Sequence, residues 1–217
     1  MRIIILVLLS LIGLTVSAQS FEGEIKLTKT SGKNISNYRY YVKLPNIRIE
    51  EINEKGVLQG YMVMNTKTGI IQAASPANKS WLEVKKNENL GIEGKVECTK
   101  TSQTKTIAGI ICTLWSVKNT TEKTRINYWV ASGFDFFVPH LKLLNRKEKL
   151  TSYFVNLPSN QGFLPLESVE YLKIPGVAEH VNEQIKTTKI EAKKITDAKL
   201  FVIPKDYTKL TMTSTRK

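Results

Sequence analysis

The sequence lacks the motifs on which most hydrolases and nucleotide-dependent enzymes rely. It holds no Gly-x-Ser-x-Gly elbow, no His-Glu-x-x-His metal helix and no glycine-rich phosphate loop. Histidine is almost missing as well, since His140 and His180 are the only two. A lone histidine is more often a packing or surface residue than a catalytic base. These absences argue against an enzyme and predict neither a catalytic residue nor a cofactor.

Two carboxylate pairs are the remaining candidates for catalysis. Glu50 with Glu51, and Glu167 with Glu170, could supply the acid and the base of a glycosidase. We interpret both pairs as surface carboxylates on strands. A cluster of Glu or Asp around one open cleft would revive the hydrolase hypothesis.

Cysteine is scarce, with only Cys98 and Cys112 in the chain. Two thiols without nearby histidine ligands do not complete a tetrahedral site, so we expect no bound metal. In an exported chain, an even number of cysteines favours a disulfide. Closing a loop of about 15 residues would stabilise the fold by ~3 kcal/mol. We therefore expect Cys98 and Cys112 to pair, with two free thiols as the alternative.

The longest apolar run lies at the start of the chain. It follows Arg2 and is interrupted only by Ser10 and Gly13, and the small residues up to Ala18 suit a signal peptidase. The run is shorter than the ~20 residues of a spanning helix, which disfavours an uncleaved anchor. The residue after the expected cleavage site is Gln19 rather than cysteine, so a lipid-modified N-terminus is not supported. We expect residues 1–18 to be a signal peptide and the protein to be exported, to the periplasm or cell envelope or beyond it.

Acidic residues are outnumbered: 19 Asp and Glu against 32 Lys and Arg give a formal net charge of +13. A basic exported protein readily meets anionic lipid headgroups, acidic glycans or nucleic acid. No recognition helix, RNA-stacking motif or finger spacing accompanies the charge, so we expect no nucleic-acid partner. The basic residues are scattered in pairs such as Lys193-Lys194, which favours a solvated surface. An anionic membrane surface is the alternative.

Short segments with alternating apolar and polar residues dominate the chain, which is typical of half-buried strands. The expected strands cover residues 21–28, 38–44, 47–52, 57–64, 70–74, 81–84, 96–101, 105–109, 110–117, 125–131 and 162–174. Their spacing of about 8–12 residues predicts an antiparallel sandwich or barrel. We assign it to one domain, residues 19–207, followed by a basic C-terminal tail, residues 208–217.

Three segments depart from simple alternation. Residues 135–147 carry apolar side chains at helical spacing, which predicts a short amphipathic helix packed on the sheet. Residues 181–195 have the composition of a helix, but they show no clear helical stripe. A solvent-facing strand paired with the preceding one is favoured there, and a helix remains the alternative. Residues 197–201 suit a single helical turn.

An open barrel of antiparallel strands offers a ligand cavity at its mouth. Bulky apolar side chains on the central strands and on the helix at 135–147 could line such a cleft. The side chains expected to do so are Tyr61, Trp81, Trp115, Tyr128, Trp129, Phe137 and Leu141. For each of them, plain core packing is the alternative.

Four stretches together resemble an uncharacterised secreted family common in Bacteroidetes, which is similar in turn to the lipoprotein carriers LolA and LolB. They are the opening Phe21-Glu-Gly-Glu-Ile-Lys26, then Lys105-Thr-Ile-Ala-Gly-Ile-Ile-Cys112, Tyr128-Trp129-Val130 and Asp197-Ala-Lys-Leu-Phe-Val-Ile-Pro-Lys-Asp-Tyr207. The resemblance implies a mainly β, LolA-like fold: one curved antiparallel sheet forming an open barrel, with one or two short helices on its concave side.

In the carriers, the apolar concavity receives lipoprotein acyl chains. The resemblance therefore implies a non-enzymatic periplasmic or cell-envelope binding protein, with an apolar cleft for a lipid, an acyl chain or a lipoprotein. This chain departs from the carriers, since no residue can be matched to their lid arginine. The alternative is a structural or protein-interaction module of the envelope without a small ligand. The sequence does not indicate the oligomeric state.

Overall fold

The computed structural model describes residues 20–84, 92–144, 147–172, 176 and 178–211. The signal peptide expected at residues 1–18 lies outside the described residues, as does the end of the predicted tail. None of the described helices has the length and apolar character needed to cross a membrane.

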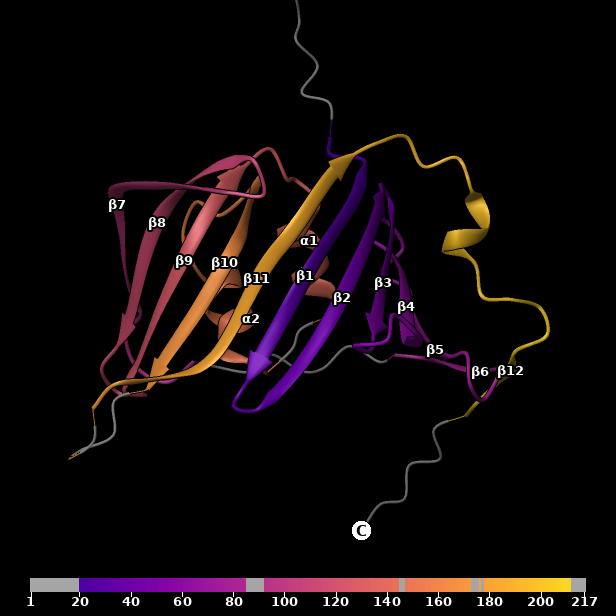
Figure 1. Ribbon diagram of the computed structural model, residues 1–217, viewed down its shortest axis with the longest axis horizontal. Helices are drawn as coiled ribbons and strands as arrows, with labels where there is room; N and C mark the ends of the chain where they lie inside the picture. The colour runs from indigo at the N-terminus through magenta and orange to yellow at the C-terminus, as the bar shows by residue number, and fades with distance from the viewer. Residues whose placement is uncertain (1–19, 85–91, 145–146, 173–175, 177, 212–217) are drawn as a thin grey trace, which may run out of the picture.

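A single mixed sheet of twelve strands forms the body of the protein (Figure 1). The strands are β1 (Gly23–Ser31), β2 (Asn34–Lys43), β3 (Asn46–Ile52), β4 (Leu58–Asn65), β5 (Ile71–Ser75), β6 (Ser80–Glu83), β7 (Glu97–Ile107), β8 (Ile110–Asn119), β9 (Thr124–Ser132), β10 (Phe163–Leu172), β11 (His180–Ala192) and β12 (Thr208–Lys209). Their spatial order is β12-β6-β5-β4-β3-β2-β1-β11-β10-β9-β8-β7. Its two edge strands, β12 and β7, are not paired with each other, so the sheet is an unclosed barrel, as the sequence predicted.

Two short helices lie against one face of the sheet, behind β1, β10 and β11 in Figure 1. They are α1 (Phe137–Leu144) and α2 (Lys149–Val155). We call the face that they cover the inner face and the opposite one the outer face. The sequence predicted α1 as one longer helix and gave no separate signal for α2.

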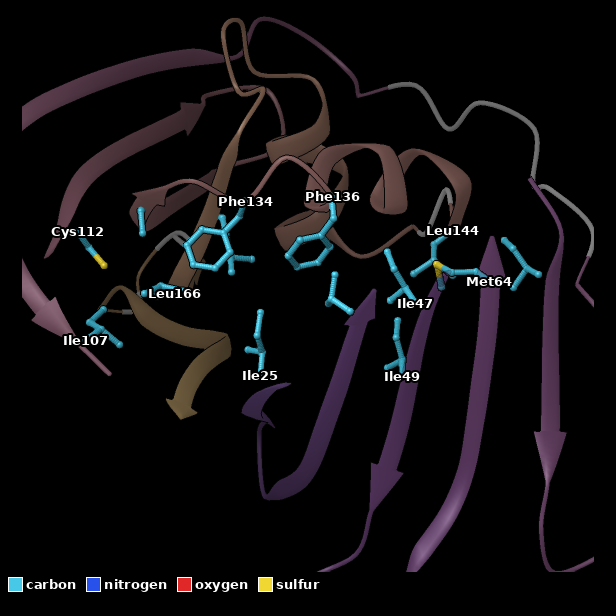
Figure 2. Packing of buried hydrophobic residues seen from close by; sticks show 14 residues of the cluster. Ile25, Ile47, Ile49, Met64, Ile107, Cys112, Phe134, Phe136, Leu144 and Leu166 are labelled. Carbon is cyan, nitrogen blue, oxygen red and sulfur yellow. The ribbon is translucent and has the colours of Figure 1, made fainter. Parts of the chain in front are cut away.

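The largest core cluster fills the space between the inner face and the segment that leads into α1 (Figure 2). Ile25 from β1 and Ile47 and Ile49 from β3 point toward Phe136 and Leu144. A second cluster lies beneath α2, where Leu150, Tyr153 and Phe154 pack on β8 and β9. Two patches of apolar side chains on the inner face therefore hold the two helices in place, and the sheet curves around the helices.

The strand predicted near 181–195 is confirmed. It is β11, which pairs with β10 on one side and with β1 on the other. The helical turn expected at 197–201 is present as the 3-10 helix η1 (Ala198–Phe201). The predicted tail starts too early, because Thr208 and Lys209 form β12.

The predicted Cys98–Cys112 disulfide is wrong, because both thiols are free. The two cysteines lie on the β7–β8 hairpin, where Cys98 is opposite Val117 and Cys112 is opposite Lys105. This register separates them by about five residues along the ladder, or ~16 Å. A disulfide needs Cα atoms within ~7 Å of each other. The disulfide was predicted from the even number of cysteines, and that number does not reveal how β7 and β8 are aligned.

The interpretation of the four glutamates as surface residues is wrong for two of them. Glu50 is 4% exposed and Glu170 is 3% exposed. Glu50 accepts hydrogen bonds from two arginines, and Glu170 accepts one from Asn182. Strand alternation alone could not show this, because the outer face is covered where Glu50 lies.

The C-terminal segment of the chain covers the outer face at this place. After β11, the C-terminal residues 193–211 run over the outer face toward the far edge of the sheet (Figure 1). Phe201, Ile203 and Tyr207 pack against the cluster centred on Tyr61. Arg48 donates a hydrogen bond to the Leu200 carbonyl at 3.1 Å. The segment then forms β12, which pairs in parallel with β6 and is the edge strand on that side of the sheet.

Candidate functional site

The candidate site is a cavity of about 100 Å³ between the inner face and the two helices. Its apolar wall comes from β1, β2, β3, β10 and β11 on the sheet side, and from α1, α2 and the residue before α1 on the other. The apolar lining residues are Ile25, Leu27, Tyr38, Tyr40, Ile49, Phe136, Phe137, Leu141, Leu144, Leu150, Leu164, Pro165 and Ile185. Alternation in β1 and β2 places Ile25, Leu27, Tyr38 and Tyr40 on one face, since every second residue points toward the helices.

Polar side chains line the remainder of the cavity. Lys29 and Glu183 form an ion pair across β1 and β11, and their side chains are 24% and 9% exposed. Ser168 and Thr187 are buried within the sheet, and Glu148 and Thr151 come from the start of α2. The cavity is therefore apolar over most of its wall and charged in one part, as a site for an amphiphilic molecule would be.

Its volume limits what the cavity can hold in this conformation. Small-molecule pockets are usually ~300–1,000 Å³, and an engineered apolar cavity of ~150 Å³ accommodates benzene. About 100 Å³ therefore suits roughly four methylene-sized groups. At ~0.8 kcal/mol per methylene, this is ~3 kcal/mol, weaker than the ~4 kcal/mol of a millimolar complex. A longer apolar chain fits only if α1 or α2 moves away from the sheet.

A polar network ties α2 to the β8–β9 turn. The Tyr153 hydroxyl donates to the Glu122 carboxylate at 2.8 Å, and the Lys149 ammonium lies 3.2 Å from the same oxygen. Lys149 also donates to the Thr124 hydroxyl at 2.6 Å. Farther along the sheet, the Tyr128 hydroxyl donates to the Leu150 carbonyl at 2.9 Å. Any displacement of α2 from the cavity must break these contacts.

Glu122 makes this network sensitive to pH. Burial alone would raise the pKa of its carboxyl, but hydrogen bonds from Tyr153, the Glu93 N–H and Lys149 outweigh burial and hold the pKa below its usual value. The unfolded chain, with a pKa of about 4.3, then takes up this proton first as the pH falls. The stability that Glu122 contributes is full above about pH 5 and is lost as the pH falls through the folded pKa.

We therefore expect Glu122→Gln to reduce the loss of stability between pH 6 and pH 3. The measurement is the free energy of unfolding in urea at each pH, for the parent and the variant. Tyr153→Phe should flatten the same curve in part, because it removes the largest contact that lowers the pKa of Glu122. Identical slopes for the parent and both variants would contradict the assignment.

Of the seven residues predicted to line a cleft, the structure places Phe137 and Leu141 on the cavity wall. Trp115 and Tyr128 lie opposite each other on β8 and β9, on the inner face, but they belong to the core beneath α2. There Trp115 stacks on Phe154 with a centroid distance of 6.2 Å. These two residues therefore help to seat the helix rather than to line the cavity.

The other three are not on the cavity wall: Tyr61 and Trp81 lie on the outer face, and Trp129 packs against the edge of the largest core cluster. Tyr61 is opposite Glu50 on one side and Ala74 on the other, and Ala74 is opposite Trp81. Both aromatics are covered by the C-terminal segment. Trp129 is opposite Glu167, and the Lys105 ammonium lies 4.4 Å from its ring centroid.

Residues that the sequence analysis did not select make up most of the cavity wall. Ile25 and Leu27 share one face of β1, and that alternation was visible in the sequence. The ion pair of Lys29 and Glu183 was not, because 154 residues separate the two in the chain. His140 packs between α1 and the sheet, 0% exposed, with its ring edge-on to Tyr40. Within the described ranges, no three His, Cys, Asp or Glu side chains gather as metal ligands would.

Comparison with solved structures identifies the fold. An uncharacterized conserved protein from Thermus thermophilus superposes with a TM-score of 0.51 at 10% identity, covering 89% of this chain and 91% of that one. Pseudomonas aeruginosa MucB, in a complex of MucA and MucB, gives a TM-score of 0.51 at 9% identity, over 89% of this chain. This chain spans 59% of the length of that one. These likenesses show a LolA-like fold, which confirms the predicted fold class.

Sequence comparison gives the family. No curated protein matches the chain. Residues 21–207, which contain all four stretches on which the resemblance rests, match a family described as a domain of unknown function. The chain therefore belongs to the DUF4412 family.

Proposed function

We propose that this protein is a non-enzymatic binding protein of the periplasm or cell envelope, which holds one acyl chain of a lipid or lipoprotein between its curved sheet and its helices. The observation that carries the proposal is the apolar cavity under α1 and α2, with the Lys29–Glu183 pair on its wall. A polar headgroup could remain near this pair while the chain lies against Leu27 and Phe137.

The small cavity makes α1 and α2 a lid in this proposal. About 100 Å³ seats too few methylenes for useful affinity, so binding must be coupled to displacement of a helix. The apolar area that the helices now bury would be replaced by the chain. Such an exchange keeps the inner face covered in both states.

A protein-interaction module without a small ligand is the second candidate. It is favoured by the low cavity volume and by the solved MucB structure of the same fold, which contains a protein partner, MucA. In that case the helices remain in place and a surface contacts the partner.

Leu27→Trp should separate the two candidates. Leu27 lines the cavity, and the larger indole would occupy space that a chain needs. We expect delipidated parent protein to bind a fluorescent acylated peptide, and Leu27→Trp to bind it at least tenfold more weakly. The readout is a fluorescence titration, with thermal unfolding to confirm that the variant is folded.

Leu210→Trp is the matched control, because Leu210 is 49% exposed and lies outside the cavity. It should bind the peptide like the parent. If the parent itself binds no acylated peptide or phospholipid, the acyl-chain proposal is wrong and the interaction module is favoured.

A further inference from the structure

A second hollow lies where the β8–β9 turn meets the start of β11. This end of the sheet is at the lower left of Figure 1. Its volume is about 430 Å³, and it is open to solvent. It is lined by Lys118, Asn119, Thr120, Lys123, Thr124, Arg125 and Glu179. Three cationic side chains and one carboxylate thus share one depression.

The three positive charges in this depression face one negative charge, that of Glu179. Arg125 donates to Glu179 through Nε at 3.1 Å, and its guanidinium lies 3.8 Å from the Tyr171 ring centroid. These contacts fix Arg125 in place and occupy Glu179. No ion pair involving Lys118 or Lys123 is found among the described residues, and both are exposed.

The register of the sheet holds two of these cations together. Lys118 on β8 lies directly opposite Arg125 on β9, and like charges in this position are destabilising. Glu97 lies opposite Lys118 on its other side, but its carboxylate bonds Lys95 at 3.2 Å. Lys123 adds a third positive charge from the turn. An anion in the depression would relieve this repulsion.

The depression shares a wall with the lid of the cavity. The hydroxyl of Thr124, one of its lining residues, accepts a hydrogen bond from Lys149 of α2. The neighbours of Lys149 in the chain, Glu148 and Leu150, line the apolar cavity. The cationic depression and the apolar cavity are therefore connected through one turn of α2.

We infer that Lys118, Lys123 and Arg125 form a docking site for the phosphate headgroups of an anionic lipid bilayer. The three cationic side chains call for an anion, and phosphate is the anionic group that lipid headgroups present. The choice of a bilayer rather than a soluble phosphate rests on the proposed function, because a membrane presents phosphate groups and acyl chains together.

The test is co-sedimentation of the protein with vesicles of phosphatidylcholine, with and without phosphatidylglycerol. We expect binding to the anionic vesicles only, and release as the salt concentration rises. Lys118→Gln combined with Lys123→Asn should weaken the binding about 30-fold, since one lysine near an anionic surface contributes about fivefold. Asn suits position 123, where φ is 50°.

Lys55→Gln combined with Lys67→Asn is the matched control. Both lysines are exposed on other turns, so this variant loses the same charge elsewhere. We expect it to bind within about threefold of the parent. Equal losses in the two double variants would overturn the site, and so would parent-like binding by the Lys118 and Lys123 variant.

Two further experiments test whether the phosphate belongs to a bilayer or is free in solution, and whether vesicle binding depends on the apolar cavity. Inorganic phosphate at millimolar concentration should displace little protein from the vesicles, and full displacement would overturn the assignment to a bilayer. Leu27→Trp should bind the anionic vesicles like the parent even where it fails to bind acylated peptide. Failure of the docking site and failure of the acyl-chain proposal are thus distinguishable.

Discussion

Glu50→Gln should lower the free energy of unfolding by about 3–5 kcal/mol. The carboxylate of Glu50 lies 2.7 Å from nitrogen atoms of both Arg39 and Arg48, and its side chain is 5% exposed. Arg48 is 10% exposed, and its guanidinium lies 3.7 Å from the Tyr61 ring centroid. Neutralising the carboxylate leaves two guanidinium groups close together, one of them buried without a counterion. The measurement is the midpoint and slope of urea unfolding.

Two variants control this prediction. Glu97→Gln removes a carboxylate from a pair whose side chains are 83% and 62% exposed, and it should change stability by no more than about 0.5 kcal/mol. Adding Arg48→Met to Glu50→Gln should recover part of the loss, since it removes the uncompensated buried charge. A loss below about 1 kcal/mol for Glu50→Gln would show that solvent or neighbouring groups already balance the arginines.

Phe154→Ala should also be among the most damaging substitutions, with a loss of about 3–5 kcal/mol. Phe154 is 0% exposed, and its ring lies between three others: Trp115 at 6.2 Å, Tyr128 at 5.2 Å and Phe137 at 5.9 Å. Truncation removes these contacts and leaves a cavity beneath α2. Because the ring seats α2 on the sheet, hydrogen exchange in residues 149–155 should accelerate more than in β1 or β2.

Phe154→Leu should lose less, because most of the volume is retained. Ile111→Ala is the surface control, since Ile111 is 72% exposed and should change stability by no more than about 0.5 kcal/mol. If Phe154→Ala and Ile111→Ala have similar stability, the packing of α2 contributes little. In that case the two helices would be a loosely held lid.

Together these predictions probe both faces of one sheet. The outer face is closed by the C-terminal segment and depends on the Arg48–Glu50 pair. The inner face is closed by α1 and α2 and depends on rings such as Phe154. Only the inner face contains the apolar cavity, so a change confined to the outer face should alter stability without altering the affinity for an acyl chain.

The sequence by itself determined the class of fold. Alternation in segments such as Ile110–Asn119 requires a half-buried strand, whatever the strand pairs with. The resemblance added the open, curved sheet with its helices. These features are local or shared by the family, so they could be predicted without the structure.

Tertiary structure decided which side chains meet. The register of β7 and β8 keeps Cys98 apart from Cys112, and the path of the C-terminal segment buries Tyr61 and partly covers Trp81 on the outer face. Sequence alternation shows that two faces exist, but it does not say which one the helices cover. The Lys29–Glu183 pair depends on β11 returning to lie beside β1, a contact between distant parts of the chain. The cavity is built from such contacts, and they exist only once the sheet has curved.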